Sequence, residues 1–501
     1  MNQVRSRTLL FTAGVIFLLA SMSFAFDFSE LEESVSEYQL ENGLKIIVME
    51  RHDAPVVSFA TYANVGAAND PKEYTGMAHM FEHMAFKGTT TLGTTDIEKE
   101  LEMMAVEDSV WYELREERKK GRFADSTRLA ELEQAFEEAI ENANHYVVPN
   151  AFDQVVETEG GVGLNAGTGS DNTTYIMSLP SNRVELWMAL ESERFLNPIL
   201  REMYRERDVV AEERRQSIES NPISRTLWGL MSTAFRAHPY GNSILGHMSD
   251  IQNYTRDAAK AFYEKYYVPS NIVVGIVGDV KPDEIFEMAE RYWGRIPARP
   301  KPEQLATVEP EQQGQRVIEL EDRAQPLVVA AWHVPASTDP DWPAVEAFSD
   351  YLGQGRTSML YKNLVKEKKI AAASGVLAGW PGDKFPCLVI AYAIPSPGNT
   401  NEDCESEIFA EVEKMQTELI PAEEVEKIKA RAKADLINNL SGNLGMAYQL
   451  CDYETRWGDW RELFLQLDRI NAITAEDIQR VAQKYFTKKN RTVAKLSTIE
   501  G

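Results

Sequence analysis

The chain has 501 residues and a formal net charge of −26 at pH 7. Hydrophobic residues make up 44 % of it, which is enough to build buried cores and excludes global disorder. This net charge argues against nucleic acid as the main partner, because phosphate contacts need clustered lysines and arginines. The charge is explained by solubility or, alternatively, by attraction of basic peptides.

Residues 1–25 have the pattern of a secretory signal peptide. Arg5 and Arg7 precede an apolar run from Leu9 to Leu19, and residues 23–25 (Ser-Phe-Ala) end it with small side chains where a signal peptidase cleaves. The run is short for a membrane span. We therefore expect a periplasmic or secreted protein with no stable membrane span after cleavage. The alternative is an uncleaved N-terminal anchor.

Strand and helix patterns alternate behind the signal, which predicts an α+β fold. The first strand is entered through Asn42-Gly43, a strong turn signal. Thr75 is the expected N-cap of a helix that runs to about Phe86 and stops at Gly88. Further predicted elements are strands at 44–49, 56–62, 172–179 and 271–277 and a helix at 279–292.

The chain is predicted to be a repeat of two unequal halves. Residues 296–315 contain four prolines and few apolar side chains, so we interpret them as a linker between domains at 26–295 and 316–501. Six positions between Ile251 and Asn271 recur between Ile470 and Asn490 at an offset of 474 − 255 = 219. Six matches in register disfavour the alternative of a chance similarity.

The first half carries an insertion. Asp70-Pro71 and Asp339-Pro340 each follow a strand and precede a helix, at an offset of 340 − 71 = 269, which exceeds the later offset of 219 by 50 residues. Residues 102–150 contain two charged helical runs, 111–120 and 127–142, separated by a turn at 121–125. They predict a helical hairpin inserted into the first domain.

The three cysteines, Cys387, Cys404 and Cys451, all lie in the last quarter of the chain. Their odd number is not a disulfide framework, although one bond remains an alternative. Since no two are closely spaced, a zinc site built from cysteines is not supported.

Two of the seven histidines lie four residues apart in the sequence His79-Met80-Phe81-Glu82-His83. Positions i and i+4 share one face of a helix, so both imidazoles can reach one metal ion, with Glu82 beside them. A zinc ion with three protein ligands keeps an open position for water, and a neighbouring carboxylate can take that water's proton. The order is the inverted form of the His-Glu-x-x-His peptidase motif. The alternative is an amphipathic helix with surface histidines.

A third ligand is required, and residues 204–214 form a candidate helix that carries acidic side chains. Glu206 and Glu213 are seven residues apart and so lie on one face. A charged helix face is usually only solvated, so this spacing alone does not select either glutamate.

The segments 79–88 (HMFEHMAFKG) and 206–213 (ERDVVAEE) resemble the pitrilysin/insulinase family of inverzincin zinc metallopeptidases. The similarity is to its short-chain branch, which includes mitochondrial and bacterial processing peptidases, and it extends over nearly all of the mature chain. Further matching segments are 164–166, 173–175, 238–241 and 266–271.

The resemblance implies one Zn²⁺ per chain, held by His79, His83 and Glu213. It implies that Glu82 is the general base and that Glu206 orients a ligand from the second shell of the site. It further implies that Asn165 and Ala166 lie on an edge strand that binds substrate as an added strand. The alternative for Asn165 is a turn residue among neighbouring glycines.

The chain departs from the family in two places. His83 and Glu213 are 213 − 83 = 130 residues apart, which is longer than in the family by about the length of the predicted hairpin. In the second half, Met359 and the alanines at 371–373 stand where the short-chain branch carries an Arg and a Tyr that hold substrate. Arg356 or Tyr361 are weaker substitutes. We therefore expect the zinc-bearing chain of a heterodimer whose related partner supplies that pair, with a homodimer as the alternative.

The second half is not expected to bind metal. Counted from the Asp-Pro pairs, the positions of His79, Glu82 and His83 become Phe348, Tyr351 and Leu352.

The expected fold is two homologous α+β domains, each an antiparallel-rich sheet flanked by helices, with the hairpin in the first. The expected function is a zinc metalloendopeptidase that hydrolyses short or unfolded polypeptides inside a clamshell dimer. The alternative is a non-catalytic scaffold or assembly subunit of the same fold, which the intact ligand set disfavours.

Overall fold

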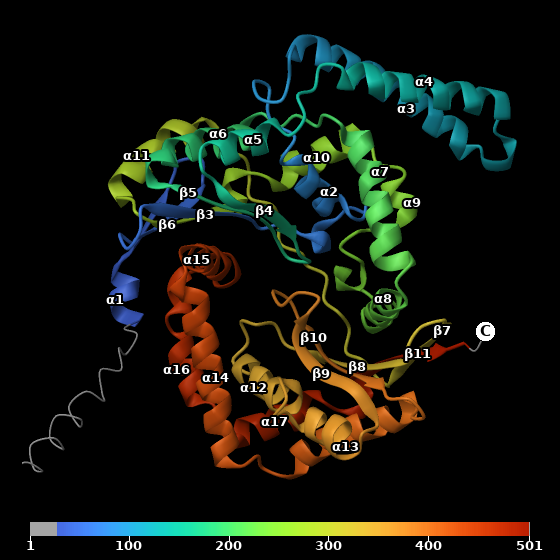
Figure 1. Cartoon of the computed structure of the whole chain (residues 1–501), viewed down its shortest axis with the longest axis vertical. Helices are drawn as coiled ribbons and strands as arrows, with labels where there is room; N and C mark the ends of the chain where they lie inside the picture. The colour runs from blue at the N-terminus through green and yellow to red at the C-terminus, as the bar shows by residue number, and fades with distance from the viewer. Residues whose placement is uncertain (1–27, 500–501) are drawn as a thin grey trace, which may run out of the picture.

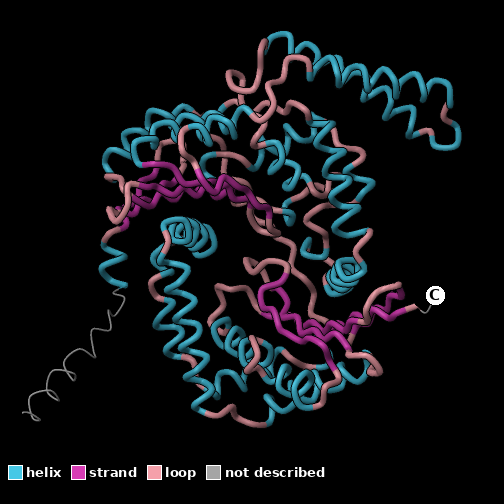
Figure 2. The backbone as a smooth tube through the Cα atoms, viewed as in Figure 1, coloured by secondary structure: helices cyan, strands magenta, loops and turns pink. Residues whose placement is uncertain are grey.

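The computed structural model describes residues 28–499, and the predicted signal at 1–25 lies outside them. Within the described residues, the chain forms a six-stranded and a five-stranded sheet, each flanked by helices (Figures 1 and 2). No helix of this part is long and apolar enough to cross a membrane. The predicted α+β class is confirmed.

The first sheet has the order β1-β2-β6-β3-β5-β4, and the second has the order β7-β11-β8-β10-β9. Among the described strands, β2–β6 and β7–β11 pair in parallel and all other pairs are antiparallel. The first sheet comprises β1 Val35–Gln39, β2 Lys45–Glu50, β3 Val56–Ala63, β4 Val162–Thr168, β5 Thr173–Pro180 and β6 Ile272–Gly278. The second comprises β7 Arg316–Asp322, β8 Leu327–Val334, β9 Ala371–Trp380, β10 Cys387–Pro395 and β11 Arg491–Thr498.

The two sheets repeat one topology. Replacing β2, β6, β3, β5 and β4 by β7, β11, β8, β10 and β9 converts the first order into the second, with β1 added at one edge. The offset is 327 − 56 = 271 at β3 and β8, and 491 − 272 = 219 at β6 and β11. The excess of 52 residues therefore lies between β3 and β6, where the hairpin was predicted.

Helices cover both sheets. Those of the first half are α1 Phe28–Glu33, α2 Met77–Met84, α3 Ile97–Lys119, α4 Ser126–Asn144, α5 Ala151–Thr158, α6 Val184–Leu196, α7 Met203–Arg214, α8 Pro222–Ala234, α9 Met248–Ile251, α10 Arg256–Tyr266 and α11 Pro282–Tyr292. Those of the second half are α12 Trp342–Gly353, α13 Asn401–Thr417, α14 Ala422–Ser441, α15 Asn443–Trp457, α16 Gln466–Ala472 and α17 Ala475–Tyr485. Residues 297–315 contain no helix or strand.

Each half lends one helix to the other. Helix α8 packs on β7, β8 and β11, where Leu230 and Met231 are fully buried in the second half's core. Helix α15 packs on β3 and β6 on the inner face of the first sheet, with Met446 and Leu450 fully buried (Figure 1). The helical cover of each sheet is therefore completed by the other half, a feature that the sequence did not indicate.

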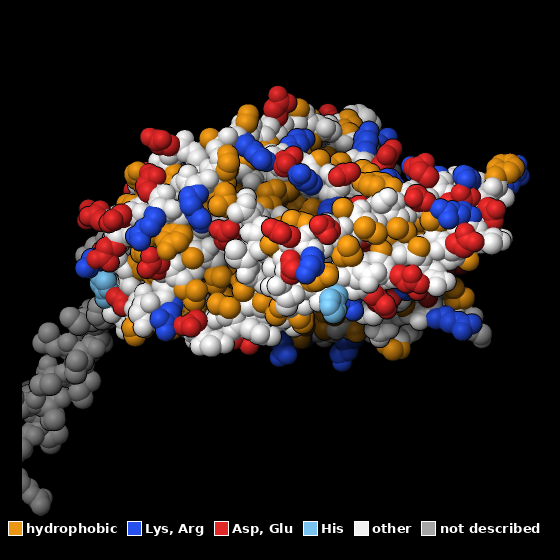
Figure 3. Space-filling view, turned by 90° about the horizontal axis from the view of Figure 1, so that it is seen from above, with side chains coloured by type: hydrophobic (Ala, Val, Ile, Leu, Met, Phe, Trp, Pro, Cys, Tyr) orange, Lys and Arg blue, Asp and Glu red, His pale blue; other side chains and the backbone are white. Residues whose placement is uncertain are grey.

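The inserted hairpin, α3 and α4, projects from the body of the molecule (Figures 1 and 3). It begins at residue 97 rather than 102, because the Asp96 side chain accepts from the Lys99 amide and caps α3. Asp125 caps α4 in the same way. Its apolar interface, including Trp111 and Phe136, continues onto Tyr204 of α7. Figure 3 shows acidic and basic side chains interspersed over its exposed surface.

Two smaller expectations are corrected. Thr75 does not cap α2: the N-cap is Gly76, and the Thr75 hydroxyl instead donates to Asp250 at 2.6 Å. The helix ends at Met84 rather than near Phe86. All three cysteines are free and buried, which removes the alternative of a disulfide.

Candidate metal centre

Helix α2 places the three residues of the inverted motif beneath the first sheet's edge. Its first turn is capped by Asp70, whose carboxylate accepts from the amides of Gly76 at 2.6 Å and Ala78 at 2.9 Å. Gly76 has φ +88°, and a Cβ there would lie 2.7 Å from the carbonyl oxygen of Leu245. The backbone at this turn therefore requires glycine.

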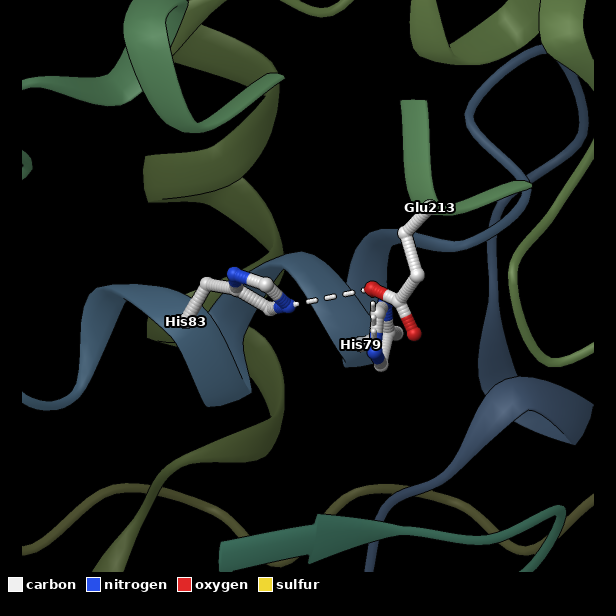
Figure 4. A group of neighbouring side chains, drawn as sticks. All are labelled: His79, His83 and Glu213. Atoms are coloured by element: carbon white, nitrogen blue, oxygen red, sulfur yellow. Dashed lines mark ion pairs between the residues drawn. The ribbon is translucent and has the colours of Figure 1, made fainter. Parts of the chain in front are cut away.

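Helix α7 brings the acidic ligand to the histidines. The Glu213 carboxylate lies 3.7 Å from His79 Nε2 and 3.5 Å from His83 Nε2 (Figure 4). One ligand atom from each of these three residues lies within 4.8 Å of the others. A π-helical turn, Arg215–Glu219, begins two residues after Glu213, where α7 ends. Such turns occur frequently at functional sites.

Glu206 supports His83 from the side opposite Glu213. Its Oε2 lies 3.2 Å from His83 Nδ1, which fixes the ring so that Nε2 faces the centre. Its other oxygen accepts from Lys87 Nζ at 2.5 Å, and Lys87 also donates to Glu202 at 3.2 Å. Burial acts to raise the pKa of Glu206, but the hydrogen bonds from His83 and Lys87 outweigh it and lower the pKa.

The donor set fits a zinc ion. Tetrahedral zinc with bonds of about 2.0–2.1 Å separates its ligand atoms by about 3.4 Å, close to the two distances from Glu213. Burial and the neighbouring His83 lower the pKa of His79 to about 4, so its imidazole is neutral and can bind a cation. The Nδ1 atom of His79 is buried without a hydrogen-bond partner. Two imidazoles and a carboxylate are ligands that zinc prefers.

A cavity of about 240 Å³ adjoins the centre. Glu82 and His83 line it, together with Lys87, Glu202 and Glu206. Glu82 follows the buried Phe81 on α2 and is itself half-buried. The general base expected from the sequence therefore lies on the cavity side of the centre.

Strand β4 forms the edge of the first sheet and lies against α2. Asn165 pairs with Ile176 and Ala166 with Tyr175 across to β5, which leaves the opposite edge of β4 unpaired within the described residues. Both residues also line the cavity. They are strand residues, which excludes the alternative that Asn165 is a turn residue.

The described residues of the second half form no comparable centre. Helix α12 contains no histidine, and its residues Phe348 and Leu352 are fully buried in the core. Met359 packs against the same core, whereas Arg356 is exposed before the π-helical turn Tyr361–Glu367. Ala371 begins the edge strand β9.

Two residues of the site were not identified as functional from the sequence. Lys87 is part of the quoted motif, but only the structure shows that it neutralises Glu206 and Glu202. Asp70 served as a marker of the repeat, and its position before α2 is the signal that could have identified it as a helix cap.

Two family models match the chain. Residues 45–113 and 139–248 match the insulinase family, peptidase family M16, and residues 253–432 match the peptidase M16 inactive domain. The unmatched gap at 114–138 lies inside the α3–α4 hairpin. The outer part of the hairpin, residues 114–138, is therefore an insertion relative to the family model.

Curated relatives match over most of their length. The chain is 29 % identical over 462 residues to the zinc protease PqqE of Helicobacter pylori, covering 89 % of each chain. It is 24 % identical to a probable mitochondrial-processing peptidase subunit beta of Arabidopsis thaliana, covering 92 % of this chain and 78 % of that one.

A crystal structure of a protease from Helicobacter pylori superimposes with a TM-score of 0.77 and 26 % identity, covering 92 % of this chain and 99 % of that one. A peptidase M16 inactive domain from Pseudomonas fluorescens shares the fold, with a TM-score of 0.73 and 16 % identity. With both family models matched in order and the inverted motif on α2, the chain belongs to the pitrilysin/insulinase family, peptidase family M16.

Proposed function

We propose that the protein is a zinc metalloendopeptidase that hydrolyses peptide bonds in short or unfolded polypeptides. The observation that carries the proposal is the approach of His79, His83 and Glu213 within 4.8 Å of one another, beside a cavity that Glu82 lines. A scaffold or a binding protein would not need a free carboxylate next to a metal centre. The names of the relatives, among them zinc proteases, support the same reading.

A bound zinc ion would act as a Lewis acid and lower the pKa of a coordinated water to about 7. His79, His83 and Glu213 would hold it. Glu82 accepts the proton of the attacking water and returns it to the leaving amine. Glu206 holds the His83 ring through Nδ1, and Lys87 keeps Glu206 ionised and in place.

The substrate would bind as an added strand on the free edge of β4. Such pairing uses the backbone of an extended chain, which explains a preference for short or unfolded polypeptides over folded proteins. Asn165 and Ala166 line the cavity that Glu82 also lines, so a peptide on this edge passes the general base.

A second chain is part of the proposal. Met359 and Ala371 occupy positions where the family resemblance implies an Arg and a Tyr, so we propose a heterodimer with a related chain that supplies them. A homodimer in which Arg356 contacts substrate is the alternative. The pattern of residues 1–25 supports export to the periplasm or beyond. A scaffold subunit of the same fold is the competing function, and retention of the complete ligand set argues against it.

The test is zinc content and cleavage of an unstructured peptide by the mature chain alone. We expect about one zinc per chain, loss of cleavage with a chelator and recovery on adding zinc. If zinc binds but no cleavage occurs, addition of a related second chain must restore it for the heterodimer to stand. A chain that binds no zinc would contradict the proposal, and one that binds zinc yet never cleaves would favour the scaffold.

A further inference from the structure

The cavity beside Glu82 has a composition suited to one particular class of side chain. Its apolar wall consists of Phe86, two residues after the end of α2, and the segment Val147-Val148-Pro149. Asn165 and Ala166 of the edge strand β4 lie on the cavity as well. A side chain of a peptide paired with β4 would therefore enter this cavity next to the bond that is cut.

One carboxylate in the wall has a buried oxygen without a hydrogen-bond partner. Asp153, in the first turn of α5, lines the cavity, and its Oδ1 atom is buried without a hydrogen bond. Lys87 is the one lysine or arginine among the described residues that line the cavity, and its ammonium group bonds to Glu206 and Glu202. Burial first, and then the neighbouring Glu157, raise the pKa of Asp153, and the charge of Lys87 offsets only part of this rise. A buried carboxylate oxygen without a partner is costly unless a ligand pairs with it.

The backbone around the cavity is strained. Asn150 and Glu202 both line it, and both adopt left-handed conformations with φ 55°. They are two of the four non-glycine residues with positive φ in the described chain. Such conformations cost free energy and cluster at binding sites.

The inserted hairpin builds one wall of this cavity. Its two ends pair where the Thr95 amide donates to the Tyr146 carbonyl at 2.8 Å and the Val148 amide donates to the Gly93 carbonyl at 3.0 Å. This pairing holds Val147, Val148 and Pro149 against the centre. The insertion is therefore tied to substrate contact as well as to α7.

We propose that this cavity binds a lysine or arginine side chain of the substrate, directly adjacent to the cleaved bond. The aliphatic stem of that side chain lies between Phe86 and Val148, and its charged end pairs with Asp153. Long basic side chains bury their methylene groups along apolar surface while their charge finds a partner. A charge-assisted hydrogen bond to a carboxylate is among the stronger side-chain contacts. This inference rests on the proposed peptidase function and names its substrate class.

The experiment compares unstructured peptides that differ at one residue, Lys, Arg, Met or Glu, placed on either side of the cleaved bond. The measured quantity is kcat/KM for the zinc-loaded mature chain, with its partner chain if one is needed. We expect Lys and Arg to exceed Met by about 10-fold or more at one position, as one charged hydrogen bond predicts. Asp153→Asn should bring the Lys-to-Met ratio near one. Glu157→Gln, exposed one turn further along α5, should leave the ratio as in the wild type.

Charge reversal gives a second, independent variant. Asp153→Lys should favour the Glu peptide over the Lys peptide. Peptide binding to the zinc-loaded Glu82→Gln variant, measured by fluorescence anisotropy, reports the same preference without any turnover. Cleavage with a Lys-to-Met ratio near one in the wild type would overturn the inference and leave the peptidase function standing. An unchanged ratio in Asp153→Asn would overturn it too. Preferential binding of Lys peptides by a chain that cleaves none would instead overturn only the peptidase function.

Discussion

Helices α2 and α12 follow equivalent strands, β3 and β8, in the two repeats. Helix α2 carries the candidate metal ligands, whereas the corresponding side chains of α12 pack into the core. On α2, His79 is 7 % exposed and, with His83, faces Glu213. On α12, Phe348 and Leu352 are fully buried, and the ring of Phe348 stacks on Phe486 with centroids 3.7 Å apart. The comparison teaches that the repeat preserves strand order, whereas the candidate metal centre among the described residues is confined to α2, because Phe348 and Leu352 of α12 are packed into the core.

The half without the centre is nevertheless required by the other. Helix α15 of the second half covers the inner face of the first sheet, and α8 of the first half covers the second sheet. Tyr62 of β3 donates to Asp452 of α15 at 3.0 Å, a buried contact between the halves. Loss of the metal motif from the second half therefore left its structural role intact.

Introducing histidines into α12 should destabilise the second half rather than create a second metal centre. In Phe348→His/Leu352→His, two polar rings replace fully buried apolar side chains, so the free energy of unfolding should fall by about 4 kcal/mol or more. Urea unfolding measures the loss, and zinc content should stay at about one per chain. The half-buried Tyr351→His is the matched control. Binding of a second zinc would show that the two helices are more alike than the burial indicates.

Helix α8 belongs to the first half but packs on the second sheet, so a substitution in it tests whether the two sheets can be destabilised separately. Leu230→Ala removes a fully buried side chain from the second half's core and should destabilise the protein by about 2–5 kcal/mol. Hydrogen exchange should quicken in β8 and β11 more than in β3. Ile223→Ala, whose side chain is 43 % exposed on the same helix, should change little. An equal increase in hydrogen-exchange rates in both sheets would indicate that the halves unfold as one unit.

Two acidic residues of the first half, Glu206 and Glu202, both contact Lys87, but only Glu206 also contacts a histidine. Glu206→Gln should weaken zinc affinity by about 10–100-fold, because His83 loses the carboxylate that fixes its ring. Glu202→Gln is the control, since Glu202 contacts Lys87 but no histidine. Competition with a zinc-binding dye measures both variants. Equal effects would mean that Lys87, not the His83 contact, explains the result.

The smallest effect concerns Asp341, the residue directly before α12. Asp70 accepts helix amides, whereas Asp341 accepts from Arg480, Lys484 and Tyr485 at 2.6–2.8 Å. Burial alone would raise the pKa of Asp341, but these hydrogen bonds outweigh it and hold the pKa well below 3.8.

Asp341→Asn should therefore cost about 1 kcal/mol at pH 7, a value at the low end because Arg480 and Lys484 are half exposed. A group with a depressed folded-state pKa stabilises above its unfolded pKa and loses that contribution as the pH falls. The difference between wild type and variant should thus shrink below about pH 4 in urea titrations. A difference that grew on acidification would contradict the assigned contacts.

Much of the fold and the core of the site follow from local sequence patterns. Hydrophobic runs and turn signals located β2, β3, β5 and β6 to within a few residues, and the spacing of His79 and His83 placed them on one helix face. Glu213 could be selected only through the family resemblance, because a charged helix face carries no signal of its own.

The rest depends on contacts between distant segments. The exchange of α8 and α15 cannot be inferred from amphipathic periodicity, which shows that a face is buried but not against which sheet. Asp153 looks like any acidic residue in a first helical turn, and only the structure shows that its Oδ1 atom is buried without a hydrogen-bond partner. Thr75 was assigned as a cap from residue type, whereas Asp70 reaches the amides from six residues before Gly76.

The most direct test of the account compares the wild type with Glu82→Gln for zinc content and cleavage of one unstructured peptide. Glu82 is assigned the proton transfer and not metal binding, so the variant should hold about one zinc and fold as the wild type does. Its kcat should fall by about 10²–10⁴-fold. If the variant loses both its zinc and its activity, Glu82 is a zinc ligand instead. Full activity in the zinc-loaded variant would contradict the mechanism.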